Sequence, residues 1–150
     1  MNYVIYEDKA RYDAWFKIVL GLPIIFILAA TYFGSKEPES IIYLTGAALM
    51  IAVIFWLIMP RKFFIMDDKL QIKMGGPFSM KIKYDNIKIV RKLSFKGTTF
   101  GMNFATSSKT PIEIIVKKGI NLNFSPENRD QFLQNINEAM KKWQIHNQPK

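Results

Sequence analysis

The stretch IIYLTGAALMIAVIFWLIMPRKFFIMDDKLQIKM, residues 41–74, contains two hydrophobic patterns in direct succession. Its first nineteen residues, Ile41 to Met59, carry no charge. A helix of that length, at about 1.5 Å per residue, crosses the roughly 30 Å hydrocarbon core of a bilayer. After Pro60 the apolar residues recur at every second position, as in a strand with one buried face. The sequence therefore predicts a membrane helix followed at once by a β-domain.

A similar uncharged run, Ile18 to Phe33, lies before the connector of residues 34–40. Because the connector is short, we expect an antiparallel pair of membrane helices, with spans at residues 16–33 and 41–60. Residues 1–60 are thus predicted to be a transmembrane helical hairpin. Residues 61–144 are predicted to be a cytoplasmic domain, and residues 145–150 a tail.

Basic residues beside the two runs predict the orientation of the hairpin, because cytoplasmic flanks carry an excess of Lys and Arg. The flanks next to the chain ends hold Lys9, Arg11, Lys17, Arg61 and Lys62, whereas the connector holds Lys36. We therefore expect a multi-pass protein of the cell membrane, with both termini and residues 61–150 in the cytoplasm.

Two other interpretations of the apolar runs fit the sequence less well. Core helices of a soluble protein normally carry a polar stripe, which these runs lack. A cleaved signal peptide begins with positive charge, whereas Glu7, Asp8 and Asp13 precede the first run. Neither run contains a charged residue or a histidine, which an ion or proton path requires. The hairpin is therefore predicted to be an anchor rather than a transporter.

The charge of the chain is unevenly distributed. The formal net charge is +9: residues 61–150 contribute +10, and residues 1–60 contribute −1. The chain has no cysteine and one histidine. Structural zinc, iron–sulfur clusters, disulfides and Cys–His catalysis are excluded, because their ligands and nucleophiles are absent.

The basic half of the chain has the pattern of short antiparallel strands followed by one helix. Apolar residues alternate with polar ones in residues 70–74, 80–84, 112–116 and 120–124, and further strands are expected at 63–66, 87–93 and 102–106. The spacing of Phe132, Leu133, Ile136 and Met140 predicts an amphipathic helix over residues 126–143, with Ser125 as its cap. The expected fold is a membrane-anchored α+β chain, in which an antiparallel β-barrel or sandwich of six or seven strands is closed by a C-terminal helix.

Residues 61–143 resemble the bacterial pleckstrin-homology-like superfamily, in its YyaB-like branch of small membrane proteins. The resemblance is carried by the segments FFIMDDKLQIKMG, KIKYDNIKIV, IEIIVKKGINLNFSPEN and RDQFLQNINEAM. Its most specific features are the Ser125-Pro126 step before an acidic residue and the Phe132-Leu133 pair. The resemblance implies a pleckstrin-homology (PH) fold and implies no catalytic residues.

No candidate for chemistry has the partners that catalysis needs. His146 lies in the terminal tail, and Asp67-Asp68 occupies a turn in which Asx hydrogen bonds are expected. The Gly75-Gly76 pair leads into a strand rather than into a helix that could bind phosphate. Ser107-Ser108 has no base to activate it. We therefore predict no enzyme, no catalytic or metal-binding residue and no cofactor.

The basic residues remain as candidates for a binding surface. The predicted set for anionic lipid or for a protein partner is Arg61, Lys62, Lys69, Lys73, Lys81, Lys83, Lys88 and Lys92. Most lie on the outward phase of three successive strands, which we expect to be neighbours. The hypothesis is a membrane module that contacts anionic headgroups or a protein. In the alternative, the chain is a scaffold subunit that acts through its helices, and the lysines only solvate the domain. Nucleic acid ranks last, because Lys outnumbers Arg and no base-stacking motif is present.

Overall fold

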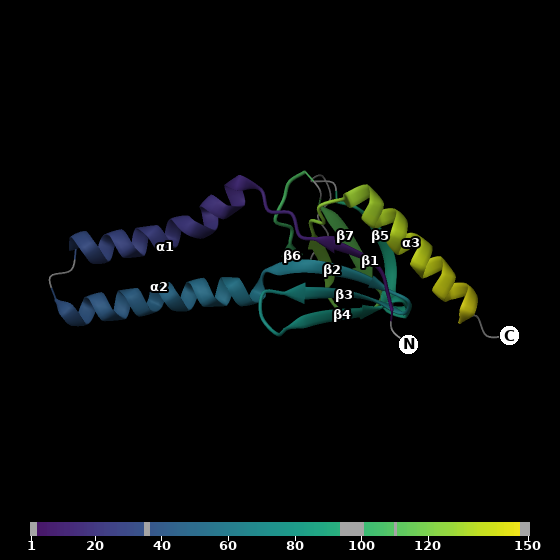
Figure 1. Ribbon diagram of the computed structural model, residues 1–150, viewed down its shortest axis with the longest axis horizontal. Helices are drawn as coiled ribbons and strands as arrows, with labels where there is room; N and C mark the ends of the chain where they lie inside the picture. Colours follow the sequence, from purple (N-terminus) through teal and green to yellow (C-terminus); the bar gives the residue numbers. More distant parts are fainter. Residues whose placement is uncertain (1–2, 35–36, 94–100, 110, 148–150) are drawn as a thin grey trace.

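The computed structural model describes residues 3–34, 37–93, 101–109 and 111–147. Two long helices, α1 (Ala14–Gly34) and α2 (Pro38–Ile58), project as an antiparallel pair from one end of a β-domain (Figure 1). Their mean hydropathies are 2.1 and 2.5, yet 6% of each apolar window is buried within the chain. Both helices are therefore long and apolar enough to cross a membrane, and they present apolar side chains outward.

The structure moves the ends of the predicted spans by a few residues. The second helix begins at Pro38, since proline is favoured as a residue type in the first helical turn, and ends at Ile58. It does not extend to residue 60, because a residue before proline is restricted to extended backbone, and Met59 has ψ 128°. Pro60 is instead the first residue of the next strand.

The β-domain consists of two four-stranded sheets and a C-terminal helix. The first sheet is antiparallel, in the order β1 (Val4–Lys9), β2 (Pro60–Met66), β3 (Lys69–Met74) and β4 (Ser79–Lys83). The second has the order β5 (Ile87–Lys92), β7 (Ile112–Val116), β8 (Asn121–Phe124) and β6 (Gly101–Phe104). A short 3-10 turn, η1 (Tyr84–Asn86), connects the sheets, and helix α3 (Arg129–His146) packs on β1, β2 and β5.

The inward phase of the strands forms the core that the alternation predicts. Leu70, Ile72 and Ile82 are at most 6% exposed, whereas the neighbouring Lys81 and Lys83 are exposed. Three phenylalanine rings join the layers: Phe63 of β2 stacks on Phe124 of β8 at 4.5 Å between centroids, and Phe132 of α3 meets both rings edge-on. The predicted α+β class, with a PH-like sandwich and a C-terminal helix, is confirmed.

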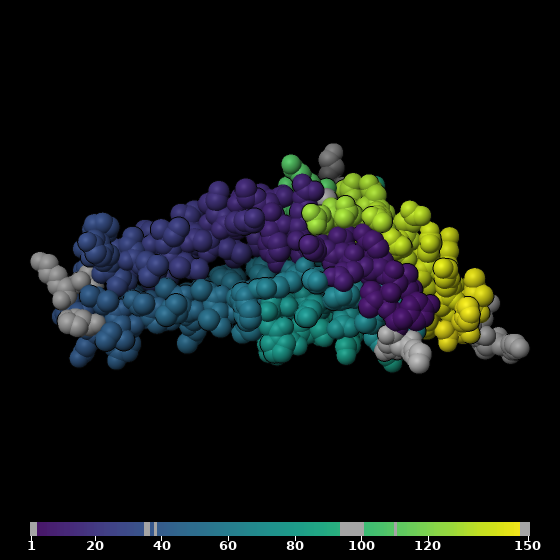
Figure 2. Space-filling model, viewed as in Figure 1, coloured from purple at the N-terminus to yellow at the C-terminus, as the bar shows by residue number. Residues whose placement is uncertain are grey.

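Four features of the sheets differ from the expectation. The sheets form an open sandwich and not a closed barrel, and β6 pairs with β8 in parallel rather than antiparallel. Strands β4 and β5 are not neighbours, because the chain crosses to the second sheet at η1. Residues 4–9, assigned by the sequence analysis to the helical hairpin, form the edge strand β1 of the first sheet, where they lie beside α3 (Figure 2).

The predicted cap of the C-terminal helix is wrong. Helix α3 begins three residues later than expected, at Arg129, with Asn128 in the cap position. The Ser125 hydroxyl is used elsewhere: it accepts a hydrogen bond from Ser107 N at 3.1 Å and donates one to the Ser107 carbonyl at 3.0 Å. Pro126 forms an isolated bridge with Ala10, which holds the segment before α3 against the end of β1.

Candidate functional site

The register of the first sheet arranges part of the predicted basic set in rows. Lys9, Lys62 and Lys73 are Cα partners across β1, β2 and β3, at the end of the sheet that adjoins α2. We call these three residues the proximal row. Lys69 and Lys83 are partners at the opposite end of the sheet, four residues farther along β3. Lys9 was absent from the predicted set, because the strand that carries it was not predicted.

Three lysines of the predicted set form an ion pair with a carboxylate. Lys62 pairs with Glu7 of β1 at 2.7 Å, and Lys69 pairs with Asp68 at 3.2 Å. On the second sheet, Lys92 of β5 pairs with Asp130 of α3 at 2.8 Å. Among the described residues no carboxylate pairs with the other five, which are Arg61, Lys73, Lys81, Lys83 and Lys88.

The expectation of one continuous patch over three neighbouring strands is wrong. Lys88 and Lys92 lie on β5, in the second sheet, whereas Lys81 and Lys83 lie on β4 at the edge of the first. The alternation of charge along the sequence shows the outward phase of each strand. It does not show which sheet a strand joins, and the 3-10 turn between β4 and β5 separates the two groups.

The turn between β3 and β4 lies against the last turn of α2. A Cβ atom on Gly75 would lie 1.6 Å from the Trp56 carbonyl oxygen, and one on Gly76 would lie 2.5 Å from Leu57 Cδ2. Only glycine permits so close an approach. The adjacent Phe78 side chain is 60% exposed at the same end of the sheet. The sequence indicates that these glycines lead into a strand, but it does not indicate their contact with the helix.

A polar cluster ties the start of α1 to the domain. The Asp13 carboxylate accepts hydrogen bonds from Ser107 Oγ at 2.8 Å and from the backbone and hydroxyl of Ser108 at 2.9 and 3.1 Å. The hydrogen bonds from Ser108 N and the Ser107 hydroxyl hold the pKa of Asp13 below its ordinary value. Asp13 N also donates to the Thr106 carbonyl at 3.1 Å. Ser107 and Ser108 therefore donate hydrogen bonds to a carboxylate whose lowered pKa makes it a weak base.

A buried carboxylate, Asp8, connects β1 to α3. Asp8 is 3% exposed and accepts hydrogen bonds from the backbone of Lys9 at 2.8 Å and of Asn128 at 3.1 Å. Burial raises the pKa of Asp8, because the charged form loses hydration that these bonds only partly replace.

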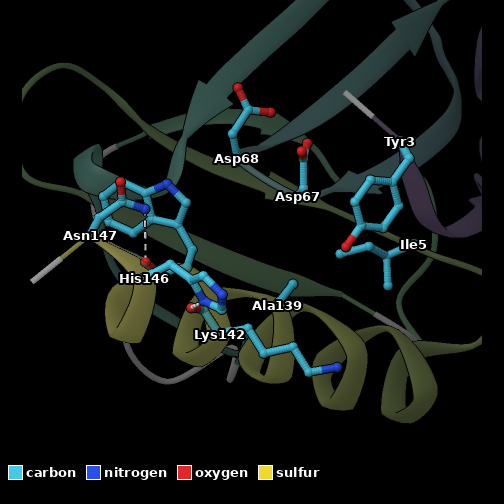
Figure 3. A pocket seen from close by; sticks show the side chains of 9 residues that line it. Tyr3, Ile5, Asp67, Asp68, Ala139, Lys142, His146 and Asn147 are labelled. Carbon is cyan, nitrogen blue, oxygen red and sulfur yellow. Dashed lines mark hydrogen bonds between the residues drawn. The ribbon is translucent and has the colours of Figure 1, made fainter. Parts of the chain in front are cut away.

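The other candidates for chemistry, Asp67, Asp68 and His146, line a pocket at the end of the domain farthest from α1 and α2 (Figure 3). Asp67 and Asp68 line it from the turn between β2 and β3, and Trp143 and His146 line it from α3. His146 Nδ1 lies 2.9 Å from the Lys142 carbonyl oxygen of its own helix. Burial, together with the charges of Asp68 and Asp67, raises the pKa of Tyr84. Among the described residues no group of three His, Cys, Asp or Glu side chains is placed to hold a metal ion.

Comparison with known proteins supports the interpretation of the sheet-and-helix unit. The family model described as the bacterial PH domain matches residues 61–140, from β2 into α3, which is more than half of the chain. A comparison with curated proteins finds no match. The predicted resemblance to a bacterial PH-like domain is confirmed, whereas the YyaB-like branch stays a prediction. The chain belongs to the bacterial PH domain family.

Proposed function

We propose that this protein is a non-enzymatic, membrane-anchored PH module whose proximal row of lysines contacts anionic headgroups at the cytoplasmic leaflet. Helices α1 and α2 are the anchor, and residues 60–147 together with β1 form the cytoplasmic domain. The two predicted spans are unchanged. Residues 4–9 belong to the domain rather than to the hairpin, because β1 pairs with β2 along five residue pairs.

The observation that carries the proposal is the direct connection of α2 to β2. A single residue, Met59, separates the last residue of the helix from the first residue of the strand. The proximal end of the first sheet must therefore lie at the surface of any bilayer that α2 crosses. A basic group near an anionic surface contributes about 1 kcal/mol of attraction.

The lysines of the first sheet differ in their distance from the headgroups, and only those close to the headgroups contribute to the contact. Lys69 lies four residues beyond Lys73 on β3, which is about 13 Å at 3.3 Å per residue. The Debye length at physiological ionic strength is about 8 Å. Lys69 and its partner Lys83 are therefore largely screened from the headgroups, whereas Lys73 is not.

The experiment compares two triple variants of the full-length protein in liposomes. The chain has no cysteine, so Ser79→Cys, opposite Lys73, carries a single fluorophore beside the proximal row. Nitroxide-labelled phosphatidylserine and phosphatidylcholine are compared as quenchers. We expect stronger quenching by the anionic lipid, a loss of that preference at high salt, and a loss in the variant with Lys9, Lys62 and Lys73 changed to Gln.

The matched control carries Lys81, Lys83 and Lys88 changed to Gln, which removes the same charge farther from the helices or on the second sheet. It should keep most of the preference for anionic lipid. Equal quenching by both lipids, unchanged by salt and by either triple variant, would contradict lipid contact. That result would favour a scaffold acting through its helices.

A further inference from the structure

A cleft opens between α1 and α2 where the helices meet the domain. It has a volume of 340 Å³ and is lined by Tyr12, Leu20, Phe55, Trp56, Met59 and Arg61. Five of these six residues are aromatic or aliphatic, and Arg61 supplies the only formal charge among them. Apolar walls with one fixed polar group are the usual composition of a small-molecule site.

The packing of the two helices explains why the cleft is at this end. Among the described residues of the pair, Thr31 and Ala48 are buried, at 6% and 3% exposure, and they mark where the helices approach closely. Toward the domain the helices diverge (Figure 1). Their ends are held apart by separate attachments to the domain: Asp13 binds the segment 106–108, and α2 continues directly into β2.

Arg61 is held in position at the edge of the cleft. Its guanidinium carbon lies 5.1 Å from the centre of the Trp56 ring, a cation–π contact. On another side, Arg61 Nε would lie 3.3 Å from a Cβ atom on Gly75, so the glycine leaves space for the side chain. The backbone is fixed as well, because the Arg61 carbonyl accepts a hydrogen bond from Ala10 N at 2.9 Å. The side chain is exposed and forms no ion pair with any described carboxylate.

We propose that this cleft binds one phospholipid molecule of the adjacent leaflet, with its phosphate on Arg61 and one acyl chain between Leu20 and Phe55. A guanidinium presents N–H donors in a planar fork that matches phosphate oxygens. The side chain is oriented in advance by Trp56, so little conformational entropy is lost on binding. A soluble phosphate compound should bind less tightly than a phospholipid, because it would leave the apolar walls of the cleft exposed to water.

This inference rests on the proposed function, since the cleft meets lipid only if α1 and α2 span a bilayer. It differs from the proximal row in kind. The row attracts any anionic surface through several exposed charges, whereas the cleft retains one molecule through one oriented group. A lipid held in this way should survive extraction into mild detergent.

The test is native mass spectrometry of the full-length protein in mild detergent with added phosphatidylglycerol. We expect one lipid to be retained by the parent chain. Arg61→Gln should lower the lipid-bound fraction about tenfold, because a charge-assisted hydrogen bond is lost. Arg61→Lys should restore retention only in part, since lysine keeps the charge but loses the planar fork. Lys83→Gln, which removes one charge at the opposite end of the first sheet, is the matched control and should retain the lipid.

Two results would contradict lipid binding in the cleft without contradicting the proposed function. One is equal retention by the parent chain and Arg61→Gln, provided that the quenching preference at Ser79→Cys is still seen. The other is displacement of the lipid by glycerol phosphate as effectively as by lysophosphatidylglycerol, which would show that the acyl chain is not recognised. If alkaline carbonate extracts the full-length protein from membranes, the anchor itself fails and both proposals fall.

Discussion

Asp13 is a single residue on which the junction between helix and domain depends. Its carboxylate accepts three hydrogen bonds from Ser107 and Ser108, and its backbone N–H donates to Thr106. Two hydroxyls and one backbone N–H would lose their acceptor if the carboxylate were removed. The free energy of unfolding should therefore respond to this side chain although it lies at the surface of the domain.

We expect Asp13→Ala to lower the melting temperature of the full-length protein in detergent at pH 7. The pKa of Asp13 is lowered in the folded state, so its contribution is present above the ordinary value of 3.8 and is lost as the pH falls through the folded pKa. The difference between variant and parent should shrink toward zero below pH 3.8. Asp85→Ala, which removes an exposed carboxylate from η1, is the control and should change little. A pH-independent difference would contradict this role.

A substitution at one position of β4 tests which of its residues face the core. Ile82 is 6% exposed, and Ile82→Asp would place an unpaired carboxylate in the core. A buried charge without a partner costs about 3–5 kcal/mol, a large part of the 5–15 kcal/mol that stabilises a typical domain. We expect loss of the folded β-domain by circular dichroism. Lys83→Asp, one residue away on the outward phase, should stay folded; unfolding of both variants would contradict the assigned phase.

The same alternation fails at Glu113, on β7 of the second sheet. The pattern predicts an outward glutamate between Ile112 and Ile114, but Glu113 is fully buried. Arg91 of the neighbouring β5 donates from Nε to its carboxylate at 2.7 Å. The spacing of apolar residues indicates which face of a strand points to the core. A charged side chain can still be buried on the other face when a partner on the neighbouring strand pairs with it. The sequence does not indicate that pairing, because 22 residues separate the two groups.

At the scale of elements, local pattern predicted the strands whose hydrophobic residues alternate and missed the one whose residues do not. In β1 the buried residue is Asp8, and Val4 and Ile5 are exposed. Its place in the sheet depends on partners in β2 and on Asn128, which is 120 residues away. The parallel pairing of β6 with β8 is equally non-local. The candidate basic residues could therefore be named from the sequence, but the proximal row depends on register.

The contact between α2 and the β3–β4 turn predicts the effect of a small substitution. Gly75→Ala would place a methyl group 1.6 Å from the Trp56 carbonyl oxygen, so the turn or the helix end must move. Overpacking of this kind costs about 1–3 kcal/mol. We expect a lower melting temperature and a shift in tryptophan fluorescence. The control is Gly46→Ala in the middle of α2, where an added Cβ meets nothing within 4 Å. Similar behaviour of the two variants would contradict the close approach.

At the scale of the whole molecule, several connections in the described part of the chain join the helical pair to the domain. Helix α2 continues into β2, the β3–β4 turn packs on the end of α2, and Asp13 holds the start of α1 to the segment 106–108. A domain attached by one flexible linker would sample many orientations. Attachments of this kind instead keep the proximal end of the first sheet toward the helices, as the proposed contact with a bilayer requires.

The charges beside the helices predict how the chain is oriented if α1 and α2 span a membrane. Five basic residues flank the domain side, whereas the connector has one, and positive flanks remain in the cytoplasm. Because the chain has no cysteine, single variants can be labelled with an impermeant maleimide. Glu37→Cys in the connector should react in intact cells. Lys141→Cys, exposed on α3, should react only after permeabilisation. The opposite pattern would place the domain outside the cell, where no cytoplasmic leaflet is available to its lysines.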